Sequence, residues 1–145
     1  MAIKWTQLIL TAIVFMIVAQ IIHTAGAIAM MGYYADPAYF SLWSKVMMST
    51  AGPPGMDFYL LSMAGNFVIG LIFAWAYSIA NKAIGDKGYM NGVKFGVFLF
   101  LLAAVPYTFM TYMILSVPTM LNLEWALESL LVYTISCVAF TKIIK

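Results

Sequence analysis

Four long apolar runs dominate the chain, and each is about as long as a helix that crosses a bilayer. They cover residues 8–30, 58–80, 93–115 and 123–140. An α-helix rises about 1.5 Å per residue, so roughly 20 apolar residues cross the hydrocarbon core. The pattern therefore predicts four transmembrane helices joined by short polar segments.

The connection between the first two runs mixes aromatic and polar residues, as segments at a membrane–water interface do. Asp36 followed by Pro37 is a helix-start signal, an N-cap residue before a proline at the first helical position. Pro53 and Pro54 end any helix before them. We expect a short interfacial helix over about 37–48. The predicted fold class is thus all-α, a four-transmembrane-helix bundle with one interfacial helix between the first and second spans.

The composition agrees with a membrane protein, because 65% of the residues are hydrophobic and only 8% are charged. The mean hydropathy of +0.99 is far above that of soluble domains. At 145 residues the chain is predicted to be a single transmembrane domain, 1–145. A core this small favours association, so the expected partners are the lipid bilayer and a second copy or other membrane subunits. The scattered lysines exclude a nucleic-acid interface.

Lysines flank the predicted helices mainly on one side: Lys4, Lys82, Lys87, Lys94, Lys142 and Lys145. The other side carries Lys45 and three acidic residues, which are Asp36, Asp57 and Glu124. The positive-inside rule then predicts a multi-pass inner (plasma) membrane protein with both termini in the cytoplasm. The interfacial helix would face the periplasm.

The third run contains a helix-packing motif and a proline. Gly88, Gly92 and Gly96 repeat every four residues, which lines up small residues on one helical face. We expect this face to pack within the chain; an interface between copies or with a partner is the alternative. Pro106 removes a backbone hydrogen bond and predicts a kink, with a hinge as the alternative.

Ionisable residues inside a membrane are costly and so are candidates for function. His23 and Glu128 are predicted at nearly the same depth in the outer half of the membrane. Several other polar residues have depths that could complete one polar layer: Asn66, Gln20, Tyr112 and Glu124. A charge-assisted His23–Glu128 pair could lock two helices together, relay a proton or cation, or hold a metal in part.

Metal, cofactor and catalytic chemistry are not expected. The chain has one histidine and one cysteine, Cys137, which are too few for a closed zinc site or a bis-histidine haem. Nucleophile and metalloprotease motifs are also absent from the sequence. The protein is therefore predicted not to be an enzyme.

The order of several motifs resembles that of an uncharacterised family of small bacterial four-helix integral membrane proteins. The shared features are His23, a Leu-Trp pair with a following methionine (Leu42, Trp43, Met47), a Gly-x-Lys-Gly turn (Gly85, Lys87, Gly88), a glycine-rich helix entry (Gly92, Lys94, Phe95, Gly96), Pro106, Tyr112, Pro118, and Trp125 with Glu128. Where that family tends to have arginine after Leu-Trp, this chain has Ser44 and Lys45. The resemblance implies joint use of His23 and Glu128 and no particular activity.

Two functions remain open at this point. The first is a non-enzymatic structural or accessory membrane subunit, in a homo-oligomer or a larger complex. The second is a small proton- or cation-coupled transporter that uses the His-Glu layer. A water-accessible cavity that reaches His23 would favour transport, and a dry, hydrogen-bonded pair would favour a scaffold.

Overall fold

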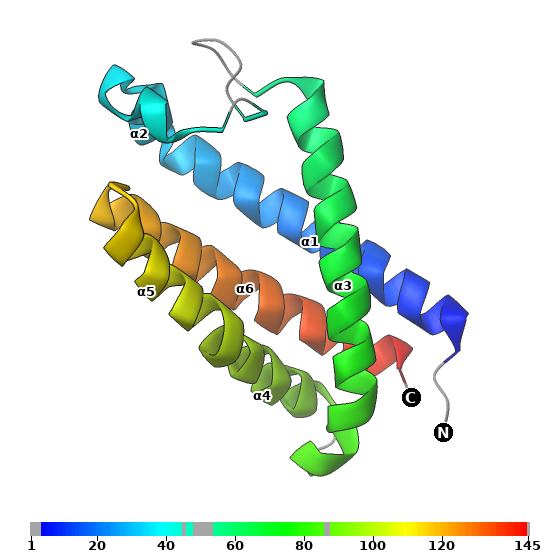
Figure 1. Ribbon diagram of the computed structural model, residues 1–145. Helices are drawn as coiled ribbons and strands as arrows, with labels where there is room; N and C mark the ends of the chain where they lie inside the picture. The colour runs from blue at the N-terminus through cyan, green and yellow to red at the C-terminus, as the bar shows by residue number, and fades with distance from the viewer. Residues whose placement is uncertain (1–3, 45, 48–53, 86–87, 145) are drawn as a thin grey trace.

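The computed structural model describes residues 4–44, 46–47, 54–85 and 88–144, and its regular structure in these ranges is helical (Figure 1). The elements are α1 (Trp5–Ala29), α2 (Met31–Ala35), the 3₁₀ helix η1 (Pro37–Leu42), α3 (Met56–Ile84), α4 (Tyr89–Leu99), the π-helical turn η2 (Phe100–Ala104), α5 (Val105–Ile114) and α6 (Thr119–Ile143). Among the described residues, four helices are long and apolar enough to cross a membrane, with α4, η2 and α5 forming the third. The all-α prediction is confirmed, and the four long apolar helices are compatible with a multi-pass membrane protein.

Each helix extends a few residues beyond the apolar run that predicted it, because a helix continues past the hydrocarbon core until a sequence signal ends it. α3 shows this at its end, where Lys82 occupies the last turn and Gly85 closes the helix. Gly85 has a φ of 77°, the left-handed conformation that favours glycine.

A helix is present where the interfacial helix was predicted, but it is shorter than expected. The Asp36 side chain accepts a hydrogen bond from the Ala38 amide at 2.9 Å, and Pro37 opens the helix, as the sequence indicated. The helix is 3₁₀ rather than α, and it ends at Leu42 because Trp43 has extended backbone. The expected end at residue 48 and the Pro53 signal lie outside the described residues.

α6 is the central helix of the bundle, since it packs against both α1 and α4, while α3 packs mainly against α1. Figure 1 shows both chain termini at one end of the bundle and α2 at the other. We call these the terminal end and the loop end. The aromatic core includes Phe15, Phe73 and Tyr133, with ring centroids 5.1–6.2 Å apart.

Glycines allow the closest helix contacts. A Cβ atom at Gly92 would lie 2.4 Å from the Cys137 carbonyl oxygen, and one at Gly96 would lie 2.6 Å from the Thr134 Cα atom. These two predicted packing glycines therefore contact α6 of the same chain. Gly88 does not pack: a Cβ there would meet nothing within 4 Å, and its φ of 64° shows that it is needed for the turn before α4.

The third span is interrupted by the π-helical turn η2 immediately before Pro106. Proline lacks the amide hydrogen that an α-helix would use at this position. A π turn changes the hydrogen-bond spacing locally and accommodates that loss. The third span thus changes helix type over Phe100–Ala104, next to Pro106, and the kink and the alternative hinge stay predictions.

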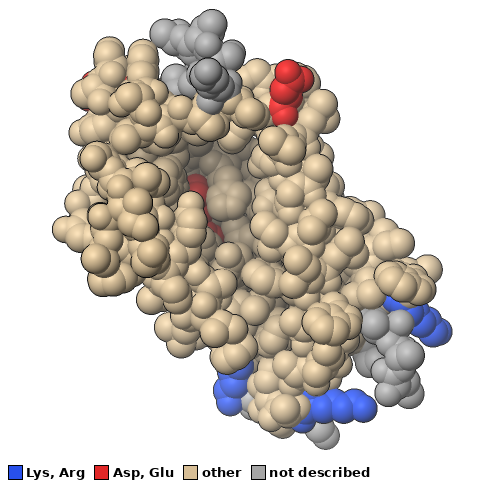
Figure 2. Space-filling view, in the orientation of Figure 1, with Lys and Arg blue, Asp and Glu red and all other residues tan. Residues whose placement is uncertain are grey.

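α3 separates from the rest of the bundle towards the loop end. The buried residues of α3 are Gly70, Ala74 and Tyr77, and the described residues of α3 before Gly70 are all half-buried or exposed. A Cβ at Gly70 would lie 2.9 Å from the Ala12 Cα atom, which marks the crossing of α3 and α1. Figure 2 shows a hollow beside α3 on the loop-end half, with acidic side-chain atoms inside it.

Charge is distributed unevenly between the two ends. The described lysines lie near helix ends at the terminal end of the bundle, where Figure 2 shows basic side chains: Lys4, Lys82, Lys94 and Lys142. Asp36 and Asp57 lie at the loop end. Lys45, Lys87 and Lys145, which the orientation argument also used, lie outside the described residues.

Candidate functional site

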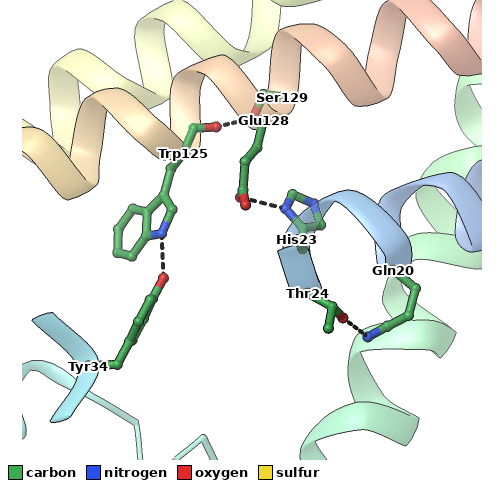
Figure 3. Close-up of polar contacts among 7 residues, drawn as sticks. All are labelled: Gln20, His23, Thr24, Tyr34, Trp125, Glu128 and Ser129. Atoms are coloured by element: carbon green, nitrogen blue, oxygen red, sulfur yellow. Dashed lines mark hydrogen bonds and ion pairs between the residues drawn. The ribbon is translucent and has the colours of Figure 1, made fainter. Parts of the chain in front are cut away.

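The structure places His23 of α1 beside Glu128 of α6, on the loop-end half of the bundle (Figure 3). The His23 Nδ1 atom lies 2.8 Å from the Glu128 Oε2 atom. An ionised carboxylate can only accept, so His23 donates this hydrogen bond when Glu128 is charged. The histidine side chain is 42% exposed and that of the glutamate only 8% exposed. The pair therefore joins two helices and has one accessible member.

Glu124 and Gly26 complete this group. A Cβ built on Gly26 would lie 1.7 Å from the Glu128 Oε1 atom and 2.0 Å from the Glu124 Oε1 atom. The two carboxyl groups, one turn apart on α6, therefore converge on the same point of α1. Glycine leaves the space that they occupy. We call His23, Gly26, Glu124 and Glu128 the carboxylate site.

The carboxylate site has more acceptors than donors. Within the described part of the chain, Glu128 Oε1 and Glu124 Oε2 are buried without a hydrogen-bond partner. Two carboxylates at one point also repel each other, so a proton or a bound cation stabilises their arrangement. The site is built to interact with positive charge.

Three aromatic residues adjoin the carboxylate site, and we call Tyr34, Trp43 and Trp125 the aromatic cluster. The Trp125 indole Nε1 donates to the Tyr34 hydroxyl oxygen at 2.7 Å. The Trp43 ring centroid lies 5.1 Å from that of Tyr34 and 6.4 Å from that of Trp125. These contacts hold α2 and the residues after η1 against α6, one turn from Glu128.

The aromatic cluster also affects the Tyr34 hydroxyl. Burial raises the pKa of Tyr34 above its usual value, and the nearby carboxylates of Glu124 and Glu128 raise it further. The hydrogen bond from Trp125 acts in the opposite direction. Tyr34 is therefore neutral at physiological pH, and its hydroxyl can both accept from Trp125 and donate.

The other residues of the predicted polar layer do not join the carboxylate site. The Gln20 side chain donates to the Thr24 hydroxyl of its own helix at 3.2 Å (Figure 3). Asn66 of α3 is half-buried, and no hydrogen bond of its side chain is found among the described residues. Tyr112 of α5 is 58% exposed on the outside of the bundle. The structure therefore has a site between α1 and α6 in place of the polar layer that was predicted to include residues of all four helices.

Tyr112 instead borders a largely apolar groove of about 360 Å³ between α5 and α6. Asn122 lines the same groove and donates from its side chain to the Thr108 carbonyl oxygen at 3.0 Å. This bond uses the polar group of Asn122 to join the two helices. The groove is a packing feature of the third and fourth spans, and it is separate from the carboxylate site.

Sequence reasoning missed Gly26 and the Trp125–Tyr34 bond. Gly26 follows His23 by three residues, so it shares a helical face with His23, and this spacing was a usable signal. Trp125 precedes Glu128 by three residues in the same way. The partners of both residues come from segments far away in the chain, and no spacing predicts those contacts.

The carboxylate site offers an imidazole and two carboxyl groups, which can exchange protons or interact with cations. Over the described ranges, no group of three or more His, Cys, Asp or Glu side chains is arranged to hold a metal ion. Comparison of the chain with protein family models, with curated proteins and with solved structures finds no match. The resemblance drawn from motif order stays a prediction, and the function is argued from the geometry of the site.

Proposed function

We propose that the protein is a non-enzymatic structural or accessory membrane subunit, which acts in a homo-oligomer or with other membrane proteins. The observation that carries this proposal is the dry packing directly beneath the His23–Glu128 pair. One turn towards the terminal end, Ala19 on α1 is 0% exposed and Val132 on α6 is 1% exposed. Phe15 follows on α1 at 1% exposure. The pair therefore lies at the border of a sealed core, which suits a helix lock better than a conduit.

The charge distribution supports an orientation for this subunit. The terminal end carries the described lysines, and the positive-inside rule assigns such an end to the cytoplasm of an inner (plasma) membrane. α2 and η1 would then face the periplasm. Fusions of alkaline phosphatase and green fluorescent protein to the C-terminus test this orientation. We expect the green fluorescent protein fusion to be fluorescent and the alkaline phosphatase fusion to be inactive. The reverse result would contradict the cytoplasmic placement of the C-terminus.

Purification in mild detergent followed by native mass spectrometry tests the subunit role. We expect a mass that corresponds to an oligomer or to a complex with another membrane protein. The Glu128→Gln variant should keep this assembly, because glutamine retains a hydrogen bond to His23. A parent protein that is monomeric in native lipid nanodiscs as well as in detergent would refute the proposal.

The second candidate, a small proton- or cation-coupled transporter, is favoured by the 42% exposure of His23. An accessible histidine beside a buried carboxylate is an arrangement that can pass on a proton. Proteoliposomes with an internal pH-sensitive dye test this function. Under the subunit proposal, the parent and Glu128→Gln should show the same slow acidification as empty vesicles. Faster acidification by the parent alone would favour transport.

A further inference from the structure

We propose that the carboxylate site binds a protonated primary amine, with Glu124 and Glu128 as the acceptors. This binding function goes beyond the subunit role, because neither assembly nor orientation requires a ligand. The inference rests on the charge of the site, its unpartnered oxygens, its access and its aromatic neighbours.

Charge is the first argument. Two carboxyl groups converge on Gly26, and the only basic group described in contact with them is the His23 imidazole. A single imidazolium can balance one carboxylate and leaves the second without a counter-charge. Inside a low-dielectric span, the second carboxyl group must either take up a proton or pair with a cationic group, and the proposed ligand is such a group.

The unpartnered oxygens determine the class of cation. The Glu128 side chain is 8% exposed. Glu128 Oε1 and Glu124 Oε2 are buried atoms without a hydrogen-bond partner among the described residues. Both atoms are acceptors, so a cationic ligand that brings N–H donors would satisfy them as well as neutralise them. A primary ammonium carries three, whereas a quaternary ammonium carries none. The site is thus matched to a primary amine.

Access and surroundings agree with this assignment. The hollow in Figure 2 reaches acidic side-chain atoms on the flank of the bundle, and the two unpartnered oxygens lie buried behind this surface. Glu128 lies about nine residues inside α6, roughly 14 Å from the start of that helix. The aromatic cluster begins one turn closer to the loop end, and aromatic rings stabilise cations that pass over their faces. A lipid headgroup or a small soluble amine could enter by this path.

Lipid retention tests the proposal first. The purified protein is incubated with equal amounts of phosphatidylethanolamine and phosphatidylcholine of identical acyl chains, and bound lipid is counted by native mass spectrometry. We expect selective retention of phosphatidylethanolamine. In the Glu124→Gln/Glu128→Gln double variant, this selectivity should fall by about tenfold or more, because two charge-assisted hydrogen bonds are lost. Asp57→Asn is the matched control, since it removes a loop-end carboxyl outside the site.

A second arm identifies the source of the amine. Thermal unfolding is followed in lipid-free micelles with added ethanolamine, and with tetramethylammonium at the same ionic strength. Stabilisation by ethanolamine alone supports a soluble amine ligand, and lipid selectivity without this effect supports a headgroup. Equal behaviour of the two lipids together with equal behaviour of the two cations would overturn the proposal.

A Gly26→Val variant keeps the proposal testable if the double variant unfolds. Valine would occupy the position of the carboxylate oxygens while leaving both glutamates in the chain. It should lose amine selectivity as well. Selectivity that survives in Gly26→Val and in the double variant would refute the site. Assembly mass, measured in the same spectra, reports separately on the subunit role.

Discussion

One added methyl group at Gly96 should weaken the whole bundle. The Cβ of Gly96→Ala would lie 2.6 Å from the Thr134 Cα atom, whereas ordinary contact begins at 3.4 Å. Since the obstacle is backbone, α4 and α6 must move apart by roughly 1 Å, and overpacking of this kind costs about 1–3 kcal/mol. Alanine recovers about 1 kcal/mol through its better helix propensity. The expected net loss is up to about 2 kcal/mol of unfolding free energy.

The thiol of Cys137 provides the assay for Gly96→Ala. It is the only cysteine of the chain, it is 0% exposed, and it lies in the same interface of α4 with α6. Maleimide labelling in increasing denaturant therefore reports the opening of this interface. The midpoint of labelling should shift to lower denaturant in Gly96→Ala.

Gly65→Ala is the matched control for this experiment. Gly65 is also inside a helix, α3, but a Cβ there would meet nothing within 4 Å. Only helix propensity applies, so we expect the midpoint to stay the same or to rise slightly. The corresponding gain in unfolding free energy is up to about 1 kcal/mol. If Gly96→Ala and Gly65→Ala gave the same midpoint, the argument from close helix contact would be refuted.

Three further predictions concern other parts of the structure. Gly26→Ala should displace the ends of the two glutamate side chains from α1 and break the 2.8 Å contact of Glu128 with His23; an unchanged His23–Glu128 contact in the variant structure would contradict the geometry of the site. Trp125→Phe should cost about 0.5–1.5 kcal/mol and raise the pKa of Tyr34 further, which difference absorbance titration against Tyr34→Phe would detect. Pro106→Ala should allow Phe100–Ala104 to become α-helical, so hydrogen exchange there should slow; equal exchange would argue that the π turn has another cause.

The sequence was sufficient for the architecture because membrane insertion makes strong demands on composition. Each of the four helices was predicted within a few residues from apolar length alone. Asp36 and Pro37 gave the start of η1 correctly, since capping is a local interaction. Its length was overestimated because nothing local indicated the extended backbone of Trp43.

The site was predictable only where one helix determines the geometry. Glu124 and Glu128 share a face because they are one turn apart, and the structure keeps them together. Tyr112 had a suitable depth but the wrong direction, since its position around α5 depends on how that helix packs. Gly88 fitted the small-residue spacing, yet its positive φ assigns it to a turn. Depth and spacing thus constrain a site less than helix rotation does.

α3 crosses α1 at Gly70, so a tilt of α3 about this crossing would move the ends of the helix most. Gly70 lies close to the middle of α3, and its contacts with Ala12 and Phe15 are the tightest that α3 makes through a glycine. The arm from Gly70 to Met56 is about 14 residues, roughly 21 Å, so a tilt of about 5° would move Met56 by about 2 Å. A displacement of that size would change the width of the hollow beside α3, while the buried residues from Gly70 to Tyr77 lie close to the crossing and would move little. Small changes in bilayer thickness that tilt α3 would therefore be converted into opening or narrowing of the approach to Glu128.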